Sequence, residues 1–479
     1  MEYNYPEPNS VFKFFYEISK IPHGSKNTKA ISDYCVNVAK DAGLWCRQDE
    51  FNNVIIKKPA SKGFENRPSV IIQGHLDMVC EKEDGNDFDF EKDALKLKVD
   101  GDFIHAQGTT LGGDDGIAVC YALALLTDND IPTPELEVIF TTDEEIGMDG
   151  AIGLDMSDIK SKMLLNIDSE SEGIFTVSCA GGVNAEITLD FDTEENEYNI
   201  MEVTFSELSG GHSGVEIDKG RANSNILIGK LLKKLTENQG VRFVAANGGS
   251  KSNAIASHAS LTVAYVDGEA ELIECVDDFE KEIKEKYSLT DPNMTVKVKT
   301  EKDKQVVAAD EKATKEIAEL LSSLPDGIYS MSEDIEGLVK TSSNFGIMKT
   351  FENSLYLLIS IRSSDEEEKT KLLEEVTKIA QKSGAKVTSG GDYPAWEYKK
   401  ESHLRDVMCR VFEIQYKKPP KTEAIHAGLE CGIFSGKVKG LDCVSFGPDI
   451  LDIHTPKERM SISSVQRVWE FLKEVLSEI

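Results

Sequence analysis

Two kinds of hydrophobic pattern divide this chain, and the division is what most constrains its fold. Over about the first 180 residues, short apolar stretches alternate with helical ones: SVIIQ is followed by GIAVCYALALLT, ELEVIFTT and KMLLNID. Strands that alternate with helices are typical of an α/β domain, a mainly parallel sheet with helices on both faces. The functional side chains of such a sheet gather beyond the carboxyl ends of its strands.

The pattern changes at residue 184. Strands such as NAEITLDFD and YNIMEVTFSE alternate apolar and polar residues, as half-exposed antiparallel strands do, and amphipathic helices lie between them. After GGDYPAWEY the first pattern returns. The sequence therefore predicts an α/β domain formed by residues 1–183 and 397–479, interrupted by an inserted α+β domain at residues 184–396. A repeated order of strand, helix and strands suggests that the insertion is a duplicated unit. A linear arrangement of two domains is the alternative.

The charge of the chain argues against several kinds of partner. The chain has 479 residues, and 53 Lys and Arg against 85 Asp and Glu give a formal net charge of −32. This excess of negative charge disfavours nucleic acid and anionic membranes as partners. No apolar run approaches the length of a spanning helix, and the N-terminal residues lack the pattern of a secretory signal. We therefore expect a cytoplasmic protein.

Five short stretches place acids or histidines at the end of a strand or the start of a loop: GHLDM, TTLGGDDG, TTDEEIG, NIDSE and DIHTP. Imidazole and carboxylate ligands suit zinc, and also manganese or cobalt. Two such ions need a shared carboxylate and one or two further ligands each. The sequence predicts a two-metal hydrolytic centre with the ligands His75, Asp114, Glu145, Asp168 and His454.

Two acidic residues beside these ligands are predicted to act without binding metal. His75 and Asp77 are two positions apart on an extended segment, so their side chains share a face. Asp77 would accept the second ring N–H of His75 and fix its tautomer. Glu144 precedes a ligand and can act as general base on the attacking water, then as acid toward the leaving amine.

In combination, the stretches GHLDMV, TTLGGDDG, TTDEEIG, NIDSE, GGHSGVEI, SIRSS, HAGLECG and DIHTP resemble the aminoacyl-histidine dipeptidases. This family, also called Xaa-His dipeptidases or carnosinase-like peptidase D, belongs to the di-zinc aminoacylase and carboxypeptidase superfamily. The resemblance covers nearly the whole chain. It implies hydrolysis of short unblocked dipeptides, preferentially Xaa-His, by a water that metal ions activate. A related aminoacylase or a broader di- or tripeptidase is the alternative. A non-catalytic binding protein is disfavoured because Glu144 and all five ligand candidates are present.

The resemblance also implies roles for single residues. Asp114 matches the bridging aspartate, Asp115 stands where relatives often carry asparagine, and Glu144 matches the catalytic glutamate. The insertion corresponds to a lid domain, through which a homodimer could form. The substrate-binding residues that the resemblance implies lie in and just after this lid: His212, Asn253, Arg362 and His426, the last with Glu430 close by in the sequence.

Two of these implied roles are specific. His212 would polarise the scissile carbonyl, either within its own chain or across a dimer. Arg362 follows an apolar strand, LYLLIS, and its planar guanidinium suits a terminal carboxylate. We expect it to reach the substrate only when the lid and the metal domain come together.

Overall fold

The computed structural model describes residues 5–237 and 240–479. Contacts between residues divide the chain into two compact units. The first consists of Met1–Ser178, Tyr398–Ala424 and Leu429–Ile479, and the second of Cys179–Glu397 and Ile425–Gly428. The first unit thus contains both the beginning and the end of the chain. The short segment Ile425–Gly428, which returns to the second unit, had no signal in the sequence.

The first unit is built around an eight-stranded sheet. Strand β3 runs parallel to β6 and to β7, and β19 runs parallel to β7, so the centre of the sheet is parallel. At one edge β1 and β2 are antiparallel. The predicted parallel sheet is confirmed for the neighbouring strands from β6 to β19, and beyond them β8 runs antiparallel to β19. In the order of hydrogen-bonded neighbours, the strands are β1 (Trp45–Gln48), β2 (Val54–Lys58), β6 (Leu136–Thr141), β3 (Val70–His75), β7 (Met163–Asn166), β19 (Asp442–Ser445), β8 (Ile174–Cys179) and β18 (Lys421–Ile425).

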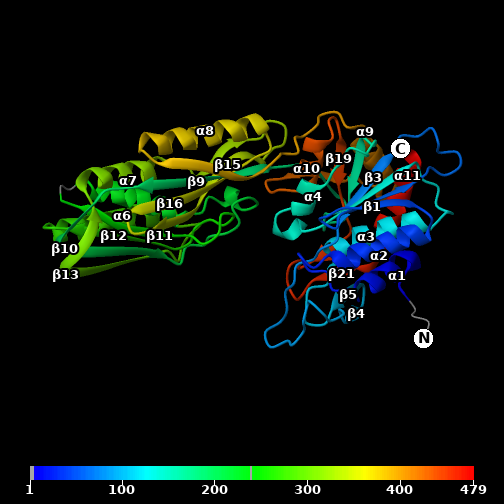
Figure 1. The fold of residues 1–479 in the computed structure, drawn as a ribbon, viewed down its shortest axis with the longest axis horizontal. Coiled ribbons are helices and arrows are strands. Elements are labelled where there is room, and N and C mark those ends of the chain that lie inside the picture. Colours follow the sequence, from blue (N-terminus) through cyan, green and yellow to red (C-terminus); the bar gives the residue numbers. More distant parts are fainter. Residues whose placement is uncertain (1–4, 238–239) are drawn as a thin grey trace. The chain divides into compact units, whose positions relative to one another are not determined.

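Both faces of this sheet are covered. Every residue of β3 and of β6 is buried, which requires helices on both faces. Val70 and Ile72 join the core formed with α1, α3 and α11, whereas Ile71, on the opposite face, is equally buried. Helices α1 and α2 both lie against α3 (Figure 1). The helices of this unit are α1 (Asn9–Ile18), α2 (Lys29–Asp41), α3 (Gly113–Thr127), α4 (Asp149–Gly153), α9 (His403–Tyr416), α10 (Glu430–Lys437) and α11 (Ile462–Glu478), with the 3-10 turn η1 (Glu144–Ile146).

A small second sheet in the same unit presents one of the predicted ligands. His454 lies in the loop that joins β20 to β21. The strands of the small sheet, in neighbour order, are β20 (Ile450–Leu451), β21 (Arg459–Ser461), β5 (Phe103–Ala106) and β4 (Leu97–Asp100).

Among the described residues, no helix is both long and apolar enough to cross a membrane.

The second unit has a nine-stranded sheet in which neighbouring strands of the described residues pair antiparallel. Its helices are α5 (Ser224–Leu235), α6 (Glu269–Lys286), α7 (Glu311–Ser323) and α8 (Glu366–Lys382), with the 3-10 turn η2 (Ile217–Lys219). In neighbour order, its strands are β13 (Thr295–Ala309), β10 (Thr193–Ser206), β12 (Ala259–Tyr265), β11 (Arg242–Gly248), β15 (Val339–Thr350), β16 (Ser354–Ser363), β9 (Gly181–Asp190) and β17 (Lys386–Tyr393), with β14 (Gly327–Met331) beside β15.

The two halves of this sheet have the same connectivity. One half runs β10, α5, β11, β12, α6, β13, and the other runs β9, α7, β15, β16, α8, β17, with β14 as an addition. The halves meet where β11 pairs with β15. The first half lies, in the chain, between β9 and α7 of the second. A duplicated unit would produce this pattern, and the duplication itself stays a prediction.

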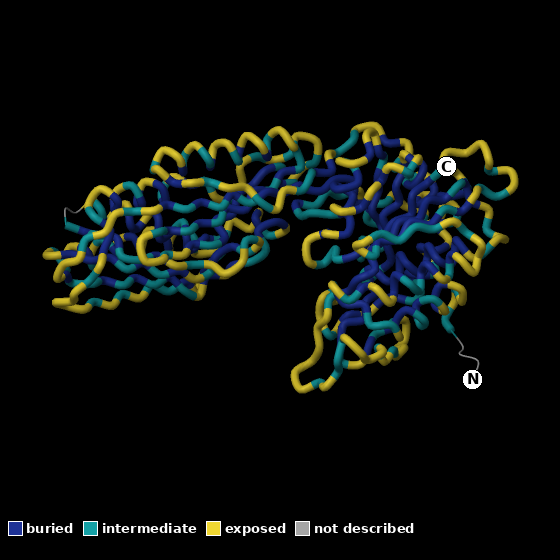
Figure 2. The backbone as a smooth tube through the Cα atoms, viewed as in Figure 1, coloured by how far each residue is buried: buried dark blue, intermediate teal, exposed yellow. Residues whose placement is uncertain are grey.

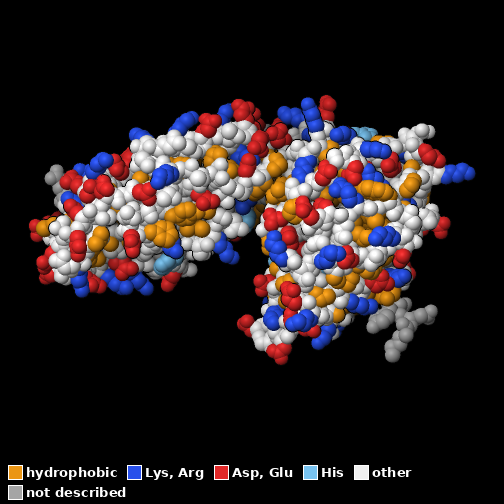
Figure 3. Space-filling view, in the orientation of Figure 1, with side chains coloured by type: hydrophobic (Ala, Val, Ile, Leu, Met, Phe, Trp, Pro, Cys, Tyr) orange, Lys and Arg blue, Asp and Glu red, His pale blue; other side chains and the backbone are white. Residues whose placement is uncertain are grey.

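Side chains of the second-unit sheet alternate between an apolar face and a polar one. In β16, Leu357, Ile359 and Ile361 are buried in one core with the apolar face of α8. Ser360 and Arg362 point to the opposite face because neighbouring strand positions alternate. Buried residues form the interior of each unit, and exposed residues its outer loops and helix faces (Figure 2). Acidic and basic side chains are intermixed over the visible face of each unit (Figure 3).

Candidate functional site

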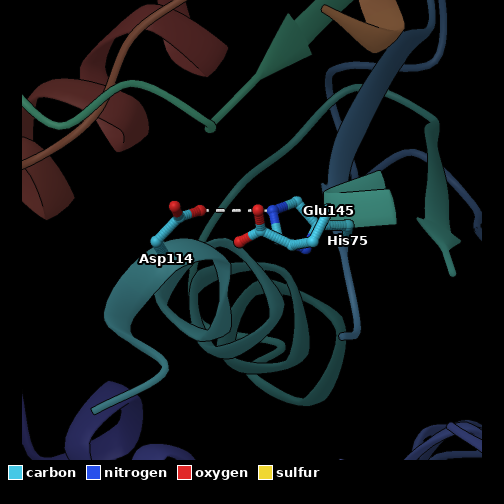
Figure 4. Close-up of side chains that lie close together, drawn as sticks. All are labelled: His75, Asp114 and Glu145. Carbon is cyan, nitrogen blue, oxygen red and sulfur yellow. Dashed lines mark hydrogen bonds and ion pairs between the residues drawn. The ribbon is translucent and has the colours of Figure 1, made fainter. Parts of the chain in front are cut away.

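Three neighbouring parallel strands end at the predicted metal centre. His75 is the last residue of β3, Glu144 and Glu145 begin the turn after β6, and Asp168 follows the end of β7. Because parallel neighbours end at the same edge of a sheet, segments that are far apart in sequence meet there. Asp114, at the start of α3, lies close to His75 and Glu145 (Figure 4).

The two carboxylate oxygens of Asp114 face two histidines. Oδ1 lies 3.2 Å from Nε2 of His75, and Oδ2 lies 3.2 Å from Nε2 of His454. Each histidine has a second carboxylate partner. Asp168 Oδ1 is 3.5 Å from His75 Nε2, and Glu145 Oε1 is 3.1 Å from His454 Nε2. All five predicted ligands are therefore brought together, with Asp114 between two pairs.

The donor set fits two divalent cations. Ligand atoms of His75, Asp114 and Glu145 all lie within 4.8 Å of one another. Two His–carboxylate pairs that share a third carboxylate are the ligand types and number that a two-metal site requires. His454 completes one pair from a loop, and its side chain is 47% exposed.

Asp115 is the competing candidate for the shared carboxylate, because His75, Asp115 and Asp168 also form a compact group. The side chain of Asp115 is 2% exposed, and its Oδ2 already accepts the backbone N–H of His75 at 3.2 Å. Burial also raises its pKa well above the usual range. The peptide bond between Asp114 and Asp115 is cis. Asp114, whose two oxygens contact the two histidines, is the better shared ligand.

Protons occupy this site when cations do not. Burial lowers the pKa of His75, but Asp114, Asp168 and Asp77 together raise it well above 6.5. Hydrogen bonds to Asp114 and Glu145 raise the pKa of His454 to about 10. A metal ion must displace these protons in order to bind, so metal affinity should increase with pH.

The carboxylate of Asp77 orients the turn that carries the predicted base. Its oxygens accept the backbone N–H of Glu144 at 3.1 Å and of Glu145 at 3.4 Å, and the Ser25 hydroxyl at 2.8 Å. The ring Nδ1 of His75 donates to the main-chain carbonyl of Asp77 at 2.9 Å, while the carboxylate lies 3.6 Å away. Asp77, which was predicted to orient His75, therefore fixes the tautomer of its ring mainly through the main-chain carbonyl.

Glu144 is positioned to exchange protons. Burial raises its pKa well above the usual range, with further contributions from the carboxylates of Asp168 and Glu430. Among the described residues, no side chain is hydrogen-bonded to its carboxylate. A half-buried carboxylate with a raised pKa, beside the predicted metal centre, has the properties of a general base.

Two buried glutamates of the first unit have roles that the sequence did not predict, although Glu430 was noted beside His426. Glu458 accepts the backbone N–H groups of Leu111, Gly113 and Gly112 at 2.7, 2.8 and 3.1 Å, and so holds the loop that presents Asp114. It lies four residues after His454, but the sequence has no signal that pairs it with this loop.

The second glutamate, Glu430, lies beneath the strand ends. It accepts the Gln73 amide at 2.5 Å and the Thr141 hydroxyl at 2.7 Å, and Gln73 also accepts the amide of Asn166 at 2.6 Å. Burial raises the pKa of Glu430 to about 8. Gln73 and Asn166 each precede a predicted ligand by two residues, so this network links the ligand-bearing strands.

The second unit gathers three of the predicted substrate-binding residues. Burial and the charge of Arg362 lower the pKa of His212, and they lower that of His426 to about 4. His426 Nε2 is 2.7 Å from the hydroxyl of Ser342, and Arg362 Nη1 donates to the Tyr393 hydroxyl at 2.9 Å. Both histidines are therefore neutral near pH 7 and lie close to one permanent cation.

His212 and Asn253 belong to two loops that are joined to each other. The Ser213 N–H donates to the Asn253 carbonyl at 2.9 Å, and the ring Nδ1 of His212 accepts the N–H groups of Gly214 and Val215. The proton of the neutral ring is therefore on Nε2. Asn344 of β15 donates to the carbonyls on both sides of Asn253, which fixes this loop. Sequence reasoning missed Asn344, because only the fold brings it to the loop.

Comparisons with known proteins agree on one family. The chain is 34% identical to the cytosol non-specific dipeptidase of Escherichia coli over 476 residues, which is 98% of either chain. The crystal structure of aminoacylhistidine dipeptidase from Vibrio alginolyticus superposes with a TM-score of 0.91 at 35% identity, covering 99% of this chain and 97% of that one. An aminopeptidase from Bacillus cereus shares the fold, with a TM-score of 0.57 at 15% identity and 99% of each chain covered. Residues 71–478 match the model of Peptidase family M20/M25/M40, and the chain belongs to this family.

Proposed function

We propose that the protein is a metal-dependent dipeptidase that hydrolyses short unblocked dipeptides, with a preference for aminoacyl-histidine substrates. The observation that carries this proposal is the position of Asp114, with one oxygen toward His75 and the other toward His454. The names of two similar proteins support the substrate class: one is an aminoacylhistidine dipeptidase and the other a cytosol non-specific dipeptidase. The second name also supports a cytosolic location.

The proposed cofactors are two divalent ions, zinc first, with manganese or cobalt as alternatives. When bound, they would polarise the scissile carbonyl and lower the pKa of the attacking water. Glu144 would take the proton of that water and deliver it to the leaving amine. Asp77 would keep Glu144 in place through its backbone N–H. The residues that would hold the ions are His75, Asp114, Glu145, Asp168 and His454.

The second unit is proposed to bind the rest of the substrate. His212, with its proton on Nε2, would donate to the scissile carbonyl oxygen, where negative charge develops. Arg362 would bind the free carboxylate of the dipeptide, which explains why an exopeptidase needs an unblocked C-terminus. Asn253 and His426 would line the same substrate site. His212 would act either within its own chain or across a homodimer.

The carboxylate role of Arg362 is tested by amidating the C-terminus of a dipeptide. Wild-type protein should lose much of its kcat/KM on the amide, because a neutral amide cannot form the two charge-assisted hydrogen bonds. Arg362→Ala should be slow on both substrates, discriminate little between them and keep its metals. If Arg362→Ala still prefers the free acid as strongly as wild type does, another residue binds the carboxylate.

A broader dipeptidase is the second candidate, because the Escherichia coli relative is described as non-specific. A dipeptide library assayed with zinc, manganese and cobalt supplied separately distinguishes the two. A preference confined to C-terminal histidine supports the first candidate. Similar rates across many C-terminal residues support the second.

A further inference from the structure

A row of three residues crosses three adjacent strands of the second unit. Arg362 on β16 is paired with Gly182 on β9, and Gly182 is paired with Tyr393 on β17. Directly paired residues of antiparallel strands share a face of the sheet. The side chains of Arg362 and Tyr393 therefore lie on the same face, separated by one strand.

Glycine in the middle of this row allows the outer two side chains to meet. A Cβ at Gly182 would lie 2.6 Å from the hydroxyl oxygen of Tyr393 and 2.7 Å from its Cε1 and Cζ. The phenol ring occupies the space that a side chain on β9 would fill. It thereby brings its hydroxyl to 2.9 Å from Nη1 of Arg362, which donates to it.

Tyr393 is itself held in place. Lys369 of α8, whose side chain is 3% exposed, donates to the main-chain carbonyl of Tyr393 at 2.9 Å and to Asp392 at 2.7 Å. A lysine buried to this extent is found where its charge is paired and hydrogen-bonded. The backbone at Tyr393 is therefore tied to α8.

The contact with Tyr393 leaves one edge of the guanidinium available. Nη1 is used, whereas the buried Nε of Arg362 has no partner in the described part of the chain. A buried polar group without a partner is costly unless a ligand satisfies it. The edge formed by Nε and Nη2 has the two parallel donors that bind a planar carboxylate.

We propose that Tyr393 is a positioning residue for carboxylate recognition, which holds Arg362 so that its Nε and Nη2 edge faces the substrate carboxylate. This rests on the proposed function, in which Arg362 binds that carboxylate. Tyr393 acts through Arg362 and does not take part in the chemical step. Gly182 is required because it leaves room for the phenol.

The first test is Tyr393→Phe, which removes the hydroxyl and keeps the ring. We expect KM for a free dipeptide to rise by about tenfold, the effect of one lost hydrogen bond to a charged group, while kcat changes much less. The preference for the free acid over the amide should fall, and the bound metal should stay at the wild-type level. Gly182→Ala, which displaces the same ring, should reproduce this pattern.

Tyr265→Phe is the matched control. Tyr265 is a buried tyrosine of the same unit, and its hydroxyl has no hydrogen-bond partner among the described residues. Its removal should leave KM and the acid-to-amide preference unchanged. Thermal unfolding of each variant shows whether a change in KM accompanies a loss of folded protein.

A double variant separates this proposal from the one on which it rests. If Tyr393 acts through Arg362, then Arg362→Ala with Tyr393→Phe should behave like Arg362→Ala alone. Two outcomes overturn only the present proposal. In the first, Tyr393→Phe has the same effect whether or not Arg362 is present. In the second, Tyr393→Phe keeps the wild-type KM and the wild-type preference for the free acid, while Arg362→Ala is defective. If Arg362→Ala itself keeps the wild-type preference, the carboxylate role of Arg362 fails, and this proposal fails with it.

Discussion

Glu458 is the residue through which the Asp114 loop can be perturbed without touching a ligand. In Glu458→Gln, a single oxygen remains where two carboxylate oxygens accept the N–H groups of Leu111, Gly112 and Gly113. The amide nitrogen then faces a donor, so at least one buried N–H loses its acceptor. An unsatisfied buried donor costs about 1–3 kcal/mol, and the bonds that remain lose their charge assistance. We expect the free energy of unfolding to fall by about 2–3 kcal/mol, and the Tm to fall by roughly 5–10 °C.

The same change should weaken metal binding, because the loop that Glu458 holds carries Asp114, the proposed shared ligand. Loss of a residue that supports a metal ligand typically lowers affinity by about 10–100-fold. The assay is calorimetric unfolding of the metal-free protein, followed by competition with a chelator for zinc.

Glu137→Gln provides the matched control. Glu137 is also fully buried and accepts two backbone N–H groups, those of Ser161 at 2.9 Å and Lys160 at 3.0 Å, but its contacts lie away from the ligand loops. The Glu137→Gln variant should lose stability but bind metal with wild-type affinity. Wild-type metal affinity in Glu458→Gln would refute the reasoning, whatever its Tm.

Three further predictions concern the two units. Removing the metals with a chelator should abolish hydrolysis, and adding a divalent ion should restore it. Asp114→Ala should lose both its bound metal and its activity, as measured by metal analysis and a rate assay. Glu144→Gln should retain its metal but lose activity by ~10²-fold or more, whereas Glu145→Gln should lose metal first. If Glu144→Gln loses metal and Glu145→Gln keeps it, the roles of base and ligand are reversed. The pKa of His426 is lowered from 6.5 to about 4 in the folded protein, so the unfolded chain binds the proton more readily. The stability that this histidine contributes is therefore complete above pH 6.5 and is lost as the pH falls toward 4. The total loss should be about 3 kcal/mol. Denaturant unfolding at pH 7 and pH 4.5 should show a smaller loss in His426→Gln, and an unchanged loss would contradict this account.

Much of the proposed site can be predicted from the sequence because its chemistry is local. His75, Glu145 and Asp168 each stand at or just beyond the end of an apolar strand, and parallel strands end at one edge. The change of hydrophobic pattern at residue 184 and its return after residue 396 lie close to the limits of the second unit, Cys179–Glu397. These features depend on spacing and periodicity, which the chain carries before it folds.

Other features exist only in the folded protein. Asp114 contacts His454 across 340 positions of sequence, and Glu458 holds the same loop. Tyr393 reaches Arg362 only because the register of three strands places Gly182 between them. Strand register and the packing of loops are set by the summed contacts of a whole unit, and a shift of one residue would turn each side chain to the other face. The sequence by itself determined which residue types stand at the strand ends, and the tertiary structure decided which of them meet.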